Sequence, residues 1–134
     1  MLKELAIQNR SYRGFDEKRR ISREELLELV DITRCVASAG NMQPLKYALV
    51  YEKEQVETVL TMTAWAGYLK EMNLPKEGMH PTAFVVICHD LNIQNNAAAS
   101  RIDVGMAAQT LLLYAAEKGL GGCAIGSFNA GKVC

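Results

Sequence analysis

The sequence predicts a single domain that combines helices with short β-strands, and three observations carry this prediction. Residues 23–37 place apolar side chains along one helical face. Residues 46–51 and 82–88 are rich in β-branched and aromatic residues, which is typical of strands. Residues 98–118 are apolar on nearly every side, which predicts a helix at the centre of the domain.

The other elements follow from shorter signals. Ser22 and Glu25 form a capping box at the start of the 23–37 helix, and Gly119 ends the 98–118 helix. We expect a helical turn at 3–9, and 52–72 reads as two short helical pieces broken near Ala66-Gly67. Residues 73–81 (NLPKEGMHP) form a loop, and 122–128 form a third strand or an extended, glycine-rich segment. A further helix begins where the sequence stops at 132–134.

Three strands and one buried helix leave apolar faces without cover. A truncated chain, a partner subunit, or both would account for this.

Composition excludes some classes of function. The chain has 134 residues, 49% of them hydrophobic, enough for a sizeable core. Its 15 basic and 15 acidic side chains cancel, so we expect no nucleic-acid and no membrane partner. The N-terminus lacks the long apolar run of a signal peptide or membrane anchor. The widely spaced Cys35, Cys88, Cys123 and Cys134 predict reduced, mostly buried thiols in a cytoplasmic protein.

Two glycine motifs resemble nucleotide-binding loops. Gly119–Ala124 fits G-x-G-x-x-A, but it follows a helix and enters a strand, which reverses the order that a dinucleotide site needs. Gly126–Lys132 (GSFNAGK) fits G-x-x-x-x-G-K, yet Val133 replaces the Ser or Thr that would hold Mg²⁺. A chance match is favoured, and nucleotide binding through Lys132 stays open as a rival.

Histidine and cysteine side chains suggest a metal site at first sight. Cys88 and His89 are adjacent on a predicted strand and therefore point to opposite faces, and His80 has no partner at zinc spacing. We expect no metal; free buried thiols and a surface histidine are the favoured interpretation.

A more coherent set of polar residues is spread along the chain. Arg10, Ser11 and Arg13 combine two guanidinium groups and a hydroxyl, which suit a phosphate monoester, although an exposed basic cluster is the simpler interpretation. The corner at 38–43 is polar beyond the needs of a turn, and glycines at 121–126 permit close approach to the backbone.

In order along the chain, these pieces resemble the FMN-dependent nitroreductase family. The opening NRSYRGFDEKRRISREELLELVDITR resembles its phosphate segment and the helix that follows. ASAGNMQP resembles its helix-end loop, and EKGLGGCAIGSF resembles the flavin-facing segment after its long apolar helix. The resemblance implies an α+β fold with a mixed, mainly antiparallel central sheet flanked by helices, and a homodimer that binds FMN at the subunit interface.

The resemblance also assigns roles to residues. Arg10, Ser11 and Arg13 would bind the phosphate. The flavin held by the other subunit would be contacted by Ser38, Ala39, Gly40, Asn41 and Gln43. The flavin ring near N5 would face the backbone of Ala124, Ile125, Gly126 and Ser127. Trp65 and Tyr68 would line the substrate pocket, with core packing as an equal alternative. No residue is expected to be catalytic, because the flavin N5 carries the hydride.

Three positions depart from the family. Asn9 replaces a further basic residue, Gly126 replaces an acidic one found in some relatives, and the chain ends before the family's last strand and C-terminal arm. The implied activity is transfer of hydride from NAD(P)H through FMN to a nitroaromatic, a quinone or a similar acceptor by a ping-pong mechanism. A flavin-binding protein without turnover is the alternative.

Overall fold

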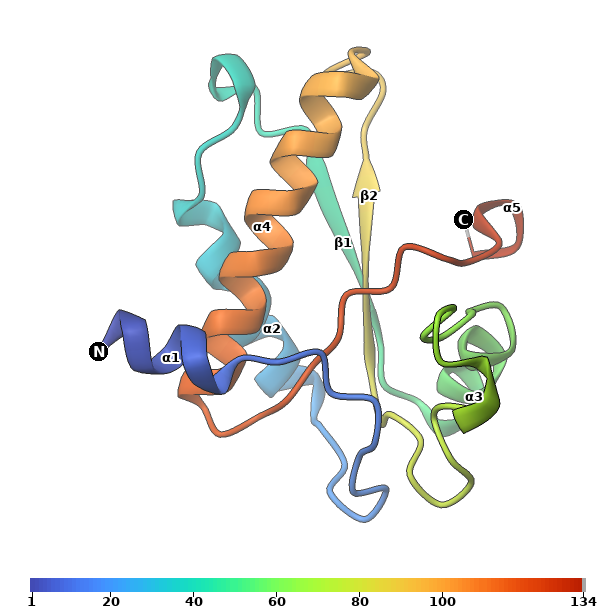
Figure 1. The fold of residues 1–134 in the computed structure, drawn as a ribbon. Helices are drawn as coiled ribbons and strands as arrows, with labels where there is room; N and C mark the ends of the chain where they lie inside the picture. The colour runs from blue at the N-terminus through green and yellow to red at the C-terminus, as the bar shows by residue number, and fades with distance from the viewer. Residues whose placement is uncertain (134) are drawn as a thin grey trace.

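A two-stranded antiparallel sheet lies at the centre of the computed structural model, which describes residues 1–133 (Figure 1). Strand β1 (Leu45–Val50) pairs with β2 (Phe84–His89), and the register runs from Leu45 opposite His89 to Val50 opposite Phe84. Both predicted strands are confirmed, with ends shifted by one or two residues.

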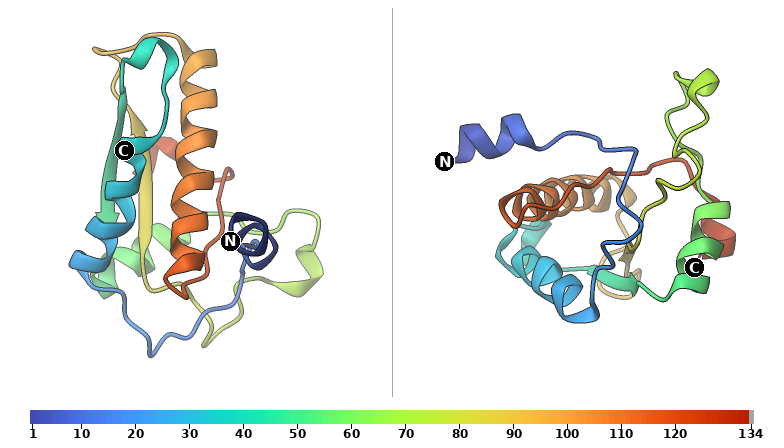
Figure 2. Two further views of the ribbon diagram at one scale, coloured as in Figure 1. Left: turned by 90° about the vertical axis from the view of Figure 1, so that its left-hand side faces the viewer. Right: turned by 90° about the horizontal axis from the view of Figure 1, so that it is seen from below.

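The long helix α4 (Ala97–Glu117) lies along one face of this sheet (Figure 2). The Asn96 side chain caps its start by accepting hydrogen bonds from the backbone N–H groups of Ala98 and Ala99. Gly119, with a φ of 75°, ends it in the left-handed conformation that glycine adopts without strain.

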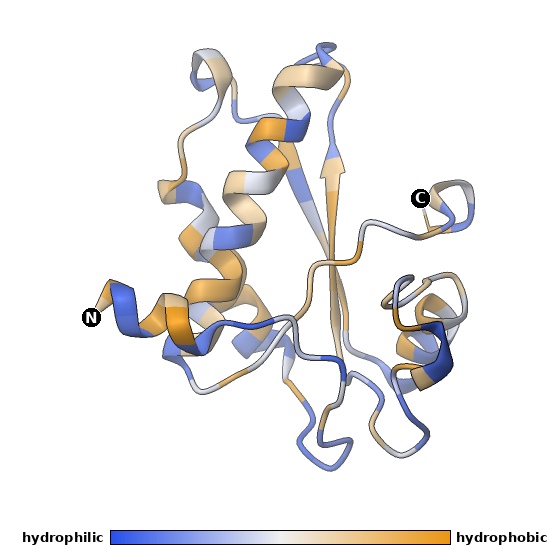
Figure 3. Ribbon diagram, in the orientation of Figure 1, coloured by the Kyte–Doolittle hydropathy of each residue, from blue (hydrophilic) through white to orange (hydrophobic). Residues whose placement is uncertain are grey.

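Helix α4 is not buried on all sides, which corrects the expectation of a fully central helix. One stripe of the helix is buried. Its members recur every three or four residues and therefore lie on one face: Ser100, Asp103, Ala107, Leu111 and Ala115. On the rest of the helix, the side chain of Ile102 is 65% exposed and that of Met106 is 37% exposed. Figure 3 shows apolar residues along α4 and β2. The helix therefore presents apolar surface to solvent in a single chain.

Helix α2 (Arg23–Asp31) packs beside the C-terminal half of α4. Its capping box is formed as predicted, with Glu25 N–H donating to Ser22 Oγ at 3.1 Å and Ser22 N–H donating to Glu25 Oε2 at 2.8 Å. The helix is shorter than the predicted 23–37, because its last turn tightens into the 3₁₀ turn η1 (Ile32–Cys35). Leu26, Leu29 and Ala115 form the core between the two helices.

Short elements complete the described chain. They are α1 (Leu2–Gln8), η2 (Ala39–Asn41), α3 (Lys53–Thr61), η3 (Lys70–Met72) and α5 (Ala130–Val133). Helices α3 and α5 lie on the side of the sheet away from α1 (Figure 1). The two helical pieces expected within 52–72 are therefore present, and so is the helix expected near the end of the sequence.

The segment 122–128 is extended but is not a strand, which agrees with the second of the two expectations. Two isolated bridges hold it, one parallel between Ser11 and Gly122 and one antiparallel between Thr63 and Phe128. Both partners lie in loops, so no continuous ladder forms. Between this segment, β2 and α4 lies an apolar cavity of about 410 Å³, in line with the predicted uncovered apolar faces.

The cysteines are less buried than expected. Cys35 is exposed, and Cys88 and Cys123 are half-buried, so the prediction of mostly buried thiols is wrong for the described residues. Cys134 lies outside them. Among residues 1–133, no helix has both the length and the apolar character that crossing a membrane requires.

Candidate functional site

The basic segment 10–13 and the glycine-rich segment 121–127 lie side by side, although more than a hundred residues separate them in the sequence. The Tyr12 N–H donates a hydrogen bond to the Gly122 carbonyl at 3.0 Å. A Cβ atom at Gly121 would come within 2.7 Å of the Tyr12 ring, closer than real Cβ contacts, so glycine is required there. The fold therefore brings two of the predicted cofactor-binding segments together.

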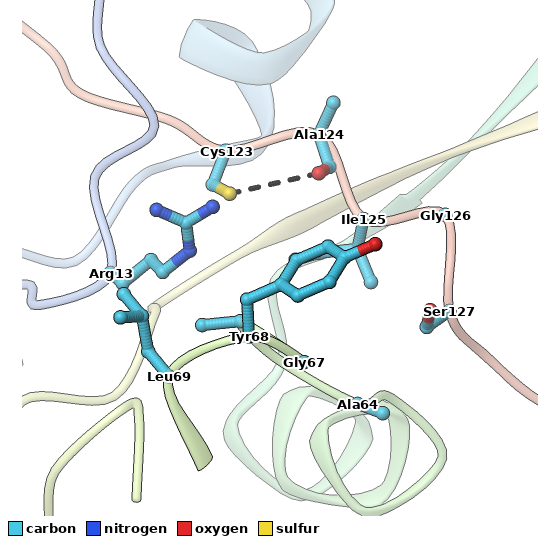
Figure 4. Close-up of a pocket in the computed structure, with 11 residues that line it drawn as sticks. Arg13, Ala64, Gly67, Tyr68, Leu69, Cys123, Ala124, Ile125, Gly126 and Ser127 are labelled. Atoms are coloured by element: carbon cyan, nitrogen blue, oxygen red, sulfur yellow. Dashed lines mark hydrogen bonds between the residues drawn. The ribbon is translucent and has the colours of Figure 1, made fainter. Parts of the chain in front are cut away.

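Arg13 points into a pocket that these segments border (Figure 4). Its Nη1 donates to the Ser11 carbonyl at 3.2 Å, while its Nε is buried and has no hydrogen-bond partner among the described residues. A buried N–H without a partner is rare and calls for an explanation. The guanidinium as a whole borders the pocket, and a charged group in that position suits binding of an anion.

The side chains of Arg10 and Ser11 lie outside the pocket, unlike that of Arg13. The Arg10 guanidinium donates to the carbonyls of Ala6 and Asn9, both at 3.0 Å, at the end of α1. The Ser11 side chain is exposed, and neither residue lines the pocket in this conformation. Of the three predicted phosphate ligands, Arg13 is the one that the fold directs into the pocket.

The pocket has a volume of about 230 Å³ and two walls. One wall consists of the predicted residues Ala124, Ile125, Gly126 and Ser127 together with Cys123, and the other comes from 64–69. The Ala64 N–H donates to the Ser127 carbonyl at 2.7 Å, and the Asn129 N–H donates to the Met62 carbonyl at 2.9 Å. These bonds fix the walls relative to each other.

Trp65 and Tyr68 have different surroundings. Tyr68 lines the pocket and is fully exposed, so its ring is free to contact a ligand (Figure 4). Trp65 packs edge-to-face on Phe15 with ring centroids 6.1 Å apart, and its Nε1 donates to Thr63 Oγ1 at 2.8 Å. It lines the apolar cavity rather than the pocket, as the core-packing alternative described.

The electrostatics of the pocket are simple. Arg13 is its one charged side chain among the residues that the structure describes, and Gly126 adds no side chain. Within residues 1–133 no group of three or more potential metal ligands exists. The arrangement suits binding of an anionic group next to a planar or apolar one, without a nucleophile and base pair of its own.

The loop 38–43 lies elsewhere. Its Ala39 N–H donates to Asp103 Oδ1 at 3.1 Å, near the start of α4, and the cavity beside the loop shares no lining residue with the pocket of Arg13. One chain therefore does not bring Ser38, Ala39, Gly40, Asn41 and Gln43 to the pocket.

The sequence interpretation missed several residues of these two regions. The pocket is also lined by Cys123, Leu69, Ala64, Ala66 and Gly67, and Tyr12 ties the 10–13 segment to Gly122 by a backbone hydrogen bond. Asp103 contacts the 38–43 loop. An acidic residue in the interior of a mainly apolar helical run was the available signal, and it pointed to Asp103.

The α+β domain thus has an arginine-bearing pocket between a glycine-rich segment and an irregular turn, a concave site of the kind in which small molecules bind to proteins. The comparisons with known proteins identify it further. The family model described as nitroreductase family matches residues 6–134, and the chain belongs to that family. No curated protein matches the chain.

Solved structures agree on the fold. A nitroreductase family protein from Clostridium novyi NT superposes with a TM-score of 0.79 at 20% identity, over 99% of this chain and 73% of that one. A candidate nitroreductase in complex with FMN from Exiguobacterium sibiricum has a TM-score of 0.79 at 17% identity, over 99% of this chain and 78% of that one. A candidate NAD(P)H:FMN oxidoreductase from Staphylococcus epidermidis has a TM-score of 0.78 at 20% identity, over 99% of this chain and 76% of that one. The nitroreductase-like α+β fold is thereby confirmed.

Proposed function

We propose that the chain is an FMN-dependent oxidoreductase of nitroreductase type that works as a homodimer. The observation that carries the proposal is the half-buried Arg13, which is the one charged residue among those described that line the pocket and lies opposite a backbone wall. A phosphate monoester fits this donor, and an aromatic ring fits beside 124–127. The related protein from Exiguobacterium sibiricum, solved with FMN, supports this choice of ligand.

In this proposal the chain binds and orients its cofactor. Arg13 holds the phosphate, with Arg10 and Ser11 available once their exposed side chains turn toward it. The backbone of Ala124, Ile125, Gly126 and Ser127 borders the ring, and the exposed Tyr68 covers the place where donor and acceptor enter in turn. When bound, FMN supplies hydride transfer from NADH or NADPH to a nitroaromatic, a quinone or a similar acceptor.

The homodimer is part of the same proposal. No residue of the 38–43 loop lines the pocket of its own chain, so the loop is free to contact the flavin of a second copy. The exposed Ile102 and Met106 on α4 and the exposed Met42 in the loop offer apolar surface for that contact.

Two alternative functions have less support than this proposal. A flavin-binding protein without turnover would use the same pocket. The phosphate-loop reading of Gly126–Lys132 has less support, because Lys132 is exposed, does not line the pocket and follows an extended segment rather than a strand.

Anaerobic half-reactions separate the enzyme from the binder. We expect NADH or NADPH to bleach the flavin absorbance of the FMN-loaded protein, and a nitroaromatic or quinone to restore it. Steady-state kinetics should then be ping-pong. If dithionite bleaches the flavin and neither nicotinamide does, the chain is a flavin-binding protein without turnover.

A further inference from the structure

Asp103 is the most unusual side chain of the described structure. It lies in the apolar helix α4 with 2% of its surface exposed. Its Oδ1 accepts a hydrogen bond from the Ala39 N–H at 3.1 Å, and its Oδ2 is buried without a partner among residues 1–133. Burying a carboxylate costs free energy, so an apolar residue at this position would give a more stable fold. Stability therefore does not explain an acidic residue here.

The loop that Asp103 contacts has a strained backbone. Gly40, Asn41 and Gln43 have φ values of 58°, 52° and 52°. Glycine adopts this left-handed region without strain and asparagine tolerates it, so the strain falls on Gln43. Two bonds of Gln43 stay within the loop: its N–H donates to Ser38 Oγ at 2.9 Å, and its Nε2 donates to Asn41 Oδ1 at 3.0 Å. A longer bond of 3.5 Å runs from Nε2 to the Val36 carbonyl. Strain of this kind persists where surrounding structure enforces it, and it gathers at functional sites.

Side-chain packing between the loop and α4 is incomplete and does not by itself hold the loop in this conformation. A cavity of about 200 Å³ lies between the loop and α4, bordered by Thr33, Ser38, Gln43, Asp103 and Ala107. The loop residues from Ala39 to Gln43 are exposed on their outer side. The Ala39–Asp103 bond joins positions 64 residues apart, and it ties the loop to the helix across this space.

We propose that Asp103 is a positioning residue for flavin binding, which rests on the proposed function. Its carboxylate holds the 38–43 loop in the strained conformation that presents Asn41 and Gln43 to the flavin of a second copy. Because the phosphate is bound by other residues, Asp103 governs affinity for the non-phosphate part of the ligand.

The test compares Asp103→Ala with Asp103→Asn in flavin titrations of the intact protein. Asp103→Ala removes the acceptor, and we expect affinity for FMN and for riboflavin to fall by the same factor, about tenfold or more. Asp103→Asn keeps an acceptor oxygen and should stay within about threefold of wild type. Leu29→Ala, a core variant remote from the loop, controls for lost stability.

Amide hydrogen exchange of Ala39 in the flavin-free protein is the second readout. We expect it to be fast in Asp103→Ala and slow in Asp103→Asn and Leu29→Ala. Wild-type flavin affinity in a folded Asp103→Ala, or equal losses of affinity in Asp103→Ala and Leu29→Ala, would overturn the inference. A wild-type protein that binds neither FMN nor riboflavin would refute the proposed function instead, and the Ala39 exchange would still report the tether.

Discussion

Arg13 is the residue on which the proposed phosphate site depends. The arginine fork is suited to phosphate because its N–H donors match two phosphate oxygens, and a hydrogen bond to a charged group is stronger than a neutral one. The buried Nε lacks a partner in the described chain, whereas Arg10 already bonds the end of α1. Arg13 should therefore contribute more than Arg10 to binding.

Replacing Arg13 tests this directly. We expect Arg13→Ala to weaken FMN by about 1.5–3 kcal/mol, or roughly ten- to a hundredfold, while riboflavin binding stays the same. Fluorescence titration with the two ligands measures the difference. Arg23→Ala, which removes an exposed charge on α2, serves as the control. Equal FMN affinity in wild type and Arg13→Ala would place the phosphate elsewhere.

At the scale of elements, the start of α2 carries the clearest electrostatic signature. Glu25 accepts a hydrogen bond from Arg19 and a second from the Ser22 backbone, and these bonds lower the pKa of its carboxyl from 4.5 to about 2. The same residue completes the capping box. A carboxyl whose pKa falls on folding stabilises the folded state above its unfolded pKa and loses that contribution as the pH falls through its folded pKa.

Stability between pH 4.5 and pH 2 should therefore depend on Glu25. We expect the free energy of unfolding of the wild type to fall more steeply over this range than that of Glu25→Gln, which keeps the cap and removes the charge. The difference should shrink in high salt because the pair with Arg19 is exposed. Urea unfolding at several pH values measures it, with Glu24→Gln as the matched control. Parallel pH profiles would contradict the assignment.

Elements with local signals could be predicted from the sequence, and elements set by distant contacts could not. The capping box, Gly119 and the alternation of β1 are local and were readable. The end of α2 at Asp31 and the failure of 122–128 to form a ladder depend on what those segments meet in space. The Ala39–Asp103 bond joins residues 64 apart, and the buried Nε of Arg13 requires the fold to be known. Hence the sequence singles out the 10–13 cluster, but not the different surroundings of Arg10 and Arg13 in the fold.

At the scale of the whole molecule, the separation of the loop from the pocket argues for two copies. We expect sedimentation at micromolar concentration to give twice the chain mass of 14.8 kDa. Ile102→Glu places a charge on the exposed face of α4 and should yield a monomer with weakened flavin binding. Leu27→Glu, on the exposed side of α2, should remain a dimer. A stable, flavin-loaded monomer would contradict the shared site.

The absorption spectrum of the purified protein after incubation with excess FMN and gel filtration tests the central claim most directly. A pocket of this kind should retain one FMN per chain, with flavin bands whose shape and position differ from those of free FMN. Complete loss of the flavin from a folded, dimeric protein would contradict the proposed function.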